Sequence, residues 1–171
     1  MRLRIKEKMH DCFLSIGSNM GNKFKNIHSA IEYIESSPEN SYLSKSKIYE
    51  SKAMYNSSLD NFYNAVIRLE TAFSPLELLA FIKNIEKEMG RVRSSERYSA
   101  RPIDIDILSY GKKILNSREL TIPHPHIEER KFVLKPWSDI DSTYVLARTN
   151  KKISELLNET SDHSELLTVK K

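Results

Sequence analysis

The sequence predicts an α+β fold in which helices pack on the faces of an antiparallel sheet. Segments with the two-residue period of a strand mix with segments of helical period, without a regular βαβ rhythm. The link that follows the strand predicted at 103–107 is short and contains Gly111, which implies antiparallel neighbours. A length of 171 residues is typical of one domain that buries about 70% of its unfolded surface.

No internal repeat, low-complexity tract or long linker divides the chain. We therefore expect a loose N-terminal extension at 1–10, a single domain at 11–160 and a polar C-terminal tail at 161–171.

The first half of the chain predicts three strands and one helix. An apolar run at 12–16 that stops at a glycine-containing turn indicates a strand, and apolar residues at helical spacing indicate a helix at 24–36. Loose alternation predicts a second strand at 42–49, and the polar segment 51–61 predicts a loop. A third strand follows at 62–70.

Phe62 and Asn64 lie on the same face of that third strand, opposite its apolar residues. A ring and an amide two residues apart can stack on a flat heterocycle and hydrogen-bond to its edge. An ordinary edge aromatic beside a turn-favouring asparagine explains the pair equally well.

The second half opens with a helix at 75–89. Ser74 and Glu77 form the pattern of a capping box around Pro75, and Gly90 ends the helix. Further expected elements are the strand at 103–107, a turn at 110–112, a short strand at 120–122, a helix at 126–134 that ends at Pro136 and Trp137, and a last short helix around 153–157.

Asp104 and Asp106 alternate with three isoleucines, so the two acids share one face of the strand. Their spacing is about 6.6 Å, and two bare carboxylates at that distance repel by about 2.5 kcal/mol at an effective dielectric constant near 20. A divalent cation between them reverses the sign of this energy. A solvated acidic face is the alternative, and the spacing alone does not decide between the two.

Four arginines precede this strand, at 91, 93, 97 and 101. Lysine would serve solubility equally well and is plentiful in the chain, whereas guanidinium forks grip phosphate oxygens two at a time. Solubility, with Glu96 neutralising one arginine, is the alternative. Cations beside a pair of acids form the arrangement that a polyphosphate with Mg²⁺ requires.

Composition limits the partners. A net charge of +4 suits a small anionic substrate and is too weak to indicate nucleic acid or a membrane surface. The single Cys12 excludes an internal disulfide, and no apolar run has membrane-spanning length. The N-terminal residues lack the apolar core of a secretory signal. We expect a cytoplasmic protein with small-molecule substrates, no nucleic acid, no membrane and no obligate protein partner.

Several motifs occur in a fixed order between residues 13 and 134. They are Ile-Gly-Ser-Asn (16–19), Phe-Tyr-Asn-Ala (62–65), Gly-Arg-Val-Arg (90–93), Arg-Tyr-Ser-Ala-Arg-Pro-Ile-Asp-Ile-Asp-Ile (97–107), and Pro-His (123–124) followed by Arg130 and Phe132. In these residues the chain resembles the 6-hydroxymethyl-7,8-dihydropterin pyrophosphokinase family of folate biosynthesis.

The resemblance implies a ferredoxin-like fold and transfer of pyrophosphate from ATP to the pterin's hydroxymethyl oxygen, with release of AMP. By position, Asp104 and Asp106 would hold two Mg²⁺ ions, and Arg91 and Arg101 would lie nearest the transferred group. The implied pterin site is Ser51, Met54, Phe62, Asn64 and Phe132. The implied ATP site is Glu86, Arg93, Arg97, Tyr98, Ile107, Thr121, His124 and Arg130.

The chain departs from the usual family pattern at Lys52, Tyr55, Phe62, Tyr98, Ser99 and Ala100. None of these changes removes a carboxylate, a phosphate-gripping arginine or the pterin-reading amide. The loops 51–61 and 90–101 are polar, and we expect both to close over ATP. Two other classes share parts of the pattern: Asp-x-Asp glycosyltransferases, which are usually larger and built on a parallel sheet, and RNA-binding ferredoxin-like modules, whose aromatic strand signature this chain lacks.

Overall fold

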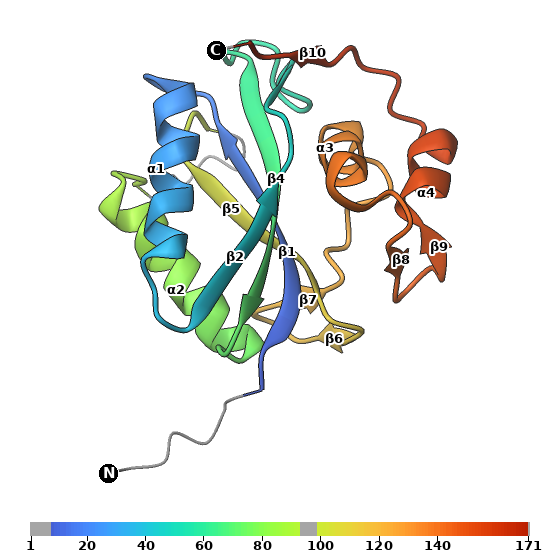
Figure 1. Ribbon diagram of the computed structural model, residues 1–171. Helices are drawn as coiled ribbons and strands as arrows, with labels where there is room; N and C mark the ends of the chain where they lie inside the picture. Colours follow the sequence, from blue (N-terminus) through green and yellow to red (C-terminus); the bar gives the residue numbers. More distant parts are fainter. Residues whose placement is uncertain (1–7, 93–98, 171) are drawn as a thin grey trace.

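The computed structural model describes residues 8–92 and 99–170. Its centre is a six-stranded antiparallel sheet with the strand order β10-β3-β4-β1-β5, and β2 pairs with part of β4 as well (Figure 1). These strands are β1 (His10–Ser18), β2 (Asn40–Lys45), β3 (Tyr49–Ser51), β4 (Phe62–Thr71), β5 (Asp104–Tyr110) and β10 (Leu167–Thr168). The α+β prediction is therefore confirmed.

Two helices cover one face of the sheet, α1 (Lys23–Glu35) and α2 (Pro75–Glu88) (Figure 1). Alternate residues of β1, β4 and β5 point toward them, including the fully buried Leu14, Ile67 and Ile105. The predicted capping box starts α2, since the Ser74 and Glu77 side chains each bond the other's backbone N–H. The order β1-α1-β2-β4-α2-β5 gives the split βαβ arrangement of a ferredoxin-like fold.

The opposite face carries α3 (Lys131–Asp141) and α4 (Ile153–Glu159) (Figure 1). A second core forms there around Trp137, which is fully buried and stacks at 4.9 Å from the Phe13 ring. Two small hairpins complete the described structure. One joins β6 (Leu115–Asn116) to β7 (Thr121–Ile122) and packs on the first core, and the other joins β8 (Val145–Leu146) to β9 (Lys151–Lys152) and packs on the second. The Ile122–Pro123 peptide bond is cis.

The strand predicted at 42–49 is in fact two strands, β2 and β3. Ser46 causes the break, because its Oγ accepts the backbone N–H of Val66 at 2.9 Å in place of a ladder carbonyl. The backbone N–H of Ser46 in turn donates to the Val66 carbonyl at 2.9 Å. The Ser46 side chain thereby satisfies a backbone N–H of β4 at the point where β2 ends and before β3 begins.

The helix predicted at 126–134 is wrong at both ends, since α3 runs from Lys131 to Asp141. Asp162, far along the chain, accepts the Lys131 N–H at 2.9 Å and fixes the start. Pro136 lies inside the helix rather than ending it. Burial of Pro136 and Trp137 in the second core offsets the hydrogen bond that proline cannot donate.

The polar C-terminal tail contains a short strand. Leu167 and Thr168 form β10 and pair with Glu50 and Tyr49 of β3. At the other end, His10 already belongs to β1, and Cys12 is fully buried as a packing residue. Within residues 8–92 and 99–170, no helix is both long and apolar enough to cross a membrane.

Candidate active site

One predicted pterin residue and one predicted metal residue lie in the same row of the sheet. Asn64 of β4, Gly17 of β1 and Asp104 of β5 are consecutive Cα partners across three strands. Asp106 pairs with Ser15 two rows away, in the next row whose side chains lie on the same face. Residues in one row share a face, so the carboxylates and the amide all face the side of the sheet that carries α3.

A cavity of about 570 Å³ opens on this face. It has the size of a small-molecule site. Residues from both predicted groups line it: Ser51, Met54, Phe62, Asn64, Arg91, Arg101, Asp104, Asp106, His124, Arg130 and Phe132. The structure therefore brings the two groups together around a single space.

Gly17 leaves room in the centre of this row. A Cβ atom there would lie 3.2 Å from Asn64 Oδ1 and 3.8 Å from Phe62 Cδ1. The contact with Asn64 would be tighter than usual, whereas the distance to Phe62 is an ordinary van der Waals contact, so glycine leaves the Asn64 amide undisturbed. Gly17 lies in the Ile-Gly-Ser-Asn motif, which was the available sequence signal for it.

Asn64 is 4% exposed and its Nδ2 donates to Ser51 Oγ at 2.9 Å. That contact orients the amide across β3 and β4, with Oδ1 toward Gly17. The Arg101 guanidinium lies 5.8 Å from the centroid of the Phe62 ring. An oriented amide beside an aromatic ring can hydrogen-bond to and stack on a heterocycle.

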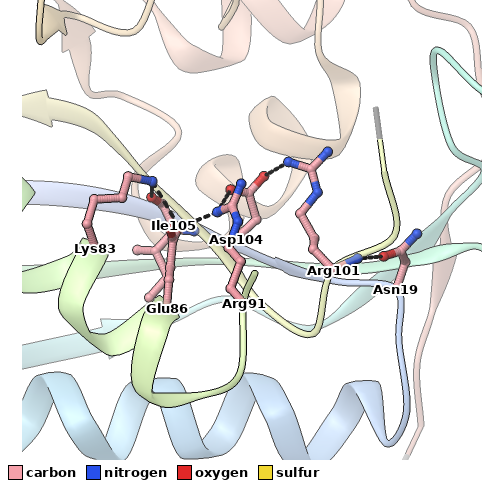
Figure 2. Close-up of polar contacts among 7 residues, drawn as sticks. All are labelled: Asn19, Lys83, Glu86, Arg91, Arg101, Asp104 and Ile105. Carbon is pink, nitrogen blue, oxygen red and sulfur yellow. Dashed lines mark hydrogen bonds and ion pairs between the residues drawn. The ribbon is translucent and has the colours of Figure 1, made fainter. Parts of the chain in front are cut away.

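Asp104 is held between two arginines (Figure 2). Arg91 Nη1 donates to its Oδ1 at 2.5 Å and Arg101 Nη1 to its Oδ2 at 2.8 Å. Burial alone would raise the pKa of Asp104, but the positive charges of Arg101 and Arg91 outweigh it and hold that pKa below its usual value. Asp104 is therefore ionised, and the two arginines compensate its charge.

Asp106 has the opposite electrostatic environment. Burial, together with the negative charge of Asp104, raises the pKa of Asp106 to about 6. The ionised form of a carboxylate whose pKa is raised in this way is stabilised when a cation neutralises its charge. Two carboxylates on one face fit Mg²⁺, which takes one or two protein carboxylates and completes its shell with phosphate oxygens and water. Among the described residues, no group of three or more acidic, histidine or cysteine side chains could hold a metal by itself.

Helix α2 holds the strand that carries both acids (Figure 2). Strand β5 is at the end of the sheet, and Ile105 turns its free backbone groups toward α2. Its N–H donates to Glu86 Oε1 at 2.7 Å, and its carbonyl accepts from Lys83 Nζ at 3.2 Å. Glu86 is 4% exposed and also pairs with Arg91 Nη1 at 2.6 Å. In the described structure Glu86 therefore positions Ile105 and Arg91, and its contact with ATP stays a prediction.

Asn19 positions the second arginine. Its Oδ1 accepts the backbone N–H of Arg101 at 2.7 Å (Figure 2). The backbone N–H of Asn19 in turn donates to the Arg101 carbonyl at 3.2 Å. This two-way contact ties the arginine segment to the end of β1. Within the described residues, Nε of Arg101 and Nε of Arg130 are buried without a hydrogen-bond partner. Both donors are available to an anionic ligand.

A second cavity of about 270 Å³ lies along the free edge of β5. Ile107, Thr121 and His124, all predicted ATP residues, line it. His124 Nδ1 accepts the backbone N–H of His126 at 3.1 Å, which leaves the proton of a neutral ring on Nε2. Burial and the charge of Arg130 lower the pKa of His124 to about 4, so its ring is neutral at physiological pH.

Three predicted ATP residues, Arg93, Arg97 and Tyr98, lie outside the described residues, as does part of the loop expected to close. Sequence reasoning missed Gly17, Asn19 and Lys83. Lys83 precedes Glu86 by one helical turn on α2, and this i,i+3 spacing was its only signal.

Comparison with known proteins gives one consistent result. A sequence model of the 7,8-dihydro-6-hydroxymethylpterin-pyrophosphokinase family matches residues 13–142. The chain is 36% identical over 155 residues to the 2-amino-4-hydroxy-6-hydroxymethyldihydropteridine pyrophosphokinase of Haemophilus influenzae, covering 91% of this chain and 96% of that protein.

Longer relatives contain the same region. The chain is 44% identical over 151 residues to the folic acid synthesis protein fol1 of Pneumocystis carinii, covering 88% of this chain but only 20% of that protein. A crystal structure of Plasmodium falciparum HPPK-DHPS has the same fold, with a TM-score of 0.71 at 16% identity over 91% of this chain and 46% of that one. The chain belongs to the 7,8-dihydro-6-hydroxymethylpterin-pyrophosphokinase family.

Proposed function

We propose that this chain transfers the pyrophosphate group of ATP to the hydroxymethyl oxygen of 6-hydroxymethyl-7,8-dihydropterin, a step of folate biosynthesis. The observation that carries the proposal is the shared row of the sheet that places Asn64 beside Asp104, with Phe62 lining the same cavity. Family membership and the similarity to the Haemophilus influenzae enzyme over nearly its whole length support it.

The larger cavity suits the pterin. Phe62 and Phe132 are aromatic surfaces on which its ring system can stack, and the amide of Asn64 is oriented to hydrogen-bond to its edge. Ser51 keeps that amide in place, and Met54 lines the same cavity. The smaller cavity, with Ile107 and Thr121, suits the nucleoside of ATP.

Arg91, Arg101 and Arg130 supply the positive charge for the phosphates. All three line the larger cavity beside the carboxylates. In the described structure Arg91 and Arg101 are paired with Asp104, so the binding of a metal-nucleotide exchanges these ion pairs for arginine–phosphate and carboxylate–metal contacts. The exchange keeps every charge compensated.

Asp104 and Asp106 would hold two Mg²⁺ ions. When bound, Mg²⁺ neutralises phosphate charge and polarises the reacting oxygens. The residues of the chain position the pterin hydroxyl in line with the β-phosphorus and exclude water from the reacting groups.

Identification of the nucleotide product tests the proposal. The protein is incubated with ATP, Mg²⁺ and the hydroxymethyl dihydropterin, and both products are identified by mass spectrometry. We expect AMP and the pterin diphosphate, with no turnover in excess EDTA or in the Asp106→Ala variant. ADP as the product would show an ordinary kinase, and displacement of ATP by single-stranded RNA would favour a binding module.

A further inference from the structure

Three side chains line both cavities: Lys83, Asp106 and His124. In the proposed function the nucleoside occupies the smaller cavity and the pterin the larger one. The triphosphate must then pass from one cavity to the other where these three side chains lie.

Lys83 is the cation of this group. Asp106 is an acid, and the His124 ring is neutral in this arrangement, since its Nδ1 accepts the backbone N–H of His126. The positive charge that the described residues place at the junction of the cavities is therefore the Lys83 ammonium.

The Lys83 ammonium is oriented with a donor to spare. Its Nζ donates to Glu86 Oε1 at 2.9 Å and to the Ile105 carbonyl at 3.2 Å (Figure 2). An ammonium has three N–H donors, so these two contacts leave one for a ligand. The side chain is 38% exposed, which leaves it accessible from the cavities.

The chemistry of the transfer specifies which oxygen needs this charge. The hydroxymethyl oxygen forms a bond to the β-phosphorus, and the bond from that phosphorus to the oxygen shared with the α-phosphate breaks. The electron pair of the broken bond remains on that oxygen, which leaves as part of AMP, and the hydroxyl proton passes to solvent. Negative charge therefore grows on the α-phosphate, next to the nucleoside cavity.

We infer that Lys83 is a catalytic residue whose ammonium donates to the α-phosphate oxygens of the departing AMP and stabilises the charge that develops there. The inference rests on the proposed function and adds a residue that acts on the leaving group. Arg91 and Arg101, in contrast, lie on the pterin side with Asp104.

The variant Lys83→Gln separates a catalytic role of Lys83 from a purely structural one. It keeps an N–H donor for the Ile105 carbonyl but removes the positive charge. Lys87→Gln is the matched control, since Lys87 is an exposed residue of the same helix, one turn further on, and lines neither cavity.

The test is the single-turnover rate at saturating ATP, Mg²⁺ and pterin, because product release can otherwise hide the chemical step. We expect Lys83→Gln to lower this rate by about 10²–10³-fold, as for loss of one donor to a developing charge. Lys87→Gln should match wild type, and Lys83→Arg should recover part of the rate. Lys83→Gln also removes a cation beside Asp104 and Asp106, so Mn²⁺ should bind more tightly to this variant than to wild type. The variant should thus be slower in transfer but stronger in Mn²⁺ binding.

A wild-type single-turnover rate for Lys83→Gln would overturn the inference, as would a rate loss accompanied by an equal loss in Lys87→Gln. Thermal unfolding of each variant identifies any loss that comes from a damaged fold, and Lys83→Met then repeats the test without the amide. AMP formation by wild type is measured separately. Wild type that makes AMP beside an unimpaired Lys83→Gln would refute the role of Lys83 and leave the proposed function standing.

Discussion

Arg91 and Asp104 form an ion pair in the lining of the larger cavity, with Nη1 and Oδ1 2.5 Å apart. The pair joins a residue expected to bind phosphate to a residue expected to bind metal. Each therefore keeps the other compensated in the absence of substrates, and the site avoids an unpaired, half-buried charge.

Replacement of Arg91 by alanine should have two opposite effects. The rate of pyrophosphate transfer should fall by about 10³-fold or more, as for loss of an arginine that acts on a transferred phosphoryl group. Mn²⁺ binding to the nucleotide-free protein should become tighter, because Asp104 loses a competing cation. Electron paramagnetic resonance of free Mn²⁺ measures the second effect. Asp104→Ala should weaken Mn²⁺ binding, and equal Mn²⁺ affinity in both variants would contradict this account.

The two acids should affect stability with opposite sign. The pKa of Asp106 is raised to about 6 in the folded protein, so its ionised form destabilises the fold once the pH rises through that value. Asp106→Asn should then raise the free energy of unfolding of the metal-free protein by about 1–2 kcal/mol at pH 8. The gain should shrink as the pH falls below 6, where Asp106 is protonated.

Asp104→Asn is the matched comparison, two residues away on the same strand. The pKa of Asp104 is lowered in the fold, so its stabilising contribution is present at pH 8 and is lost only as the pH falls through that low value. Asp104→Asn should therefore destabilise the protein at pH 8. Denaturant unfolding in EDTA measures both variants, and equal shifts would show that the environments of the two acids do not differ.

Asn64 should control the affinity for pterin and not for ATP. Asn64→Leu removes the oriented amide while it keeps a side chain of similar size in the buried site. We expect the dissociation constant for the pterin to rise by about 10–100-fold, corresponding to about 1–3 kcal/mol for an unmade buried hydrogen bond. Ser51→Ala should cost less, because the amide remains and loses only its anchor. Calorimetric titration with each substrate checks the separation, and an equal loss of ATP affinity would argue against it.

Gly17→Ala should impair pterin binding more than folding. The added methyl group would lie 3.2 Å from Asn64 Oδ1, so the amide must move by a few tenths of an ångström. Gly17 has an ordinary strand conformation and alanine is compatible with it. We expect a melting temperature close to wild type with weaker pterin affinity. A variant that binds pterin normally would place the ring away from this row.

The elements with a clear local period were predictable from the sequence. The helix that begins at the Ser74 capping box and the alternation around Asp104 and Asp106 both follow from neighbouring residues, and so does the shared face of Phe62 and Asn64. The resemblance supplied the roles of these residues, and the structure placed them around one cavity.

Contacts between distant residues could not be predicted in this way. The contact of Ser46 with Val66 breaks a strand that looks continuous in the sequence, and Asp162 fixes the start of α3 from 31 positions away. The link from Lys83 to the carbonyl of Ile105 likewise joins a helix surface to a strand backbone. Such side-chain-to-backbone contacts leave no periodic trace, because they depend on how the elements pack.

The way α2 covers the free edge of β5 has a consequence for association between molecules. An uncovered strand edge offers N–H and carbonyl groups to the strand of another copy, and such pairing leads to aggregation. Here Glu86 and Lys83 already occupy those groups of Ile105 with charged side chains. The contacts that position the strand of Asp104 and Asp106 thus also block the pairing of another protein chain with these backbone groups of β5.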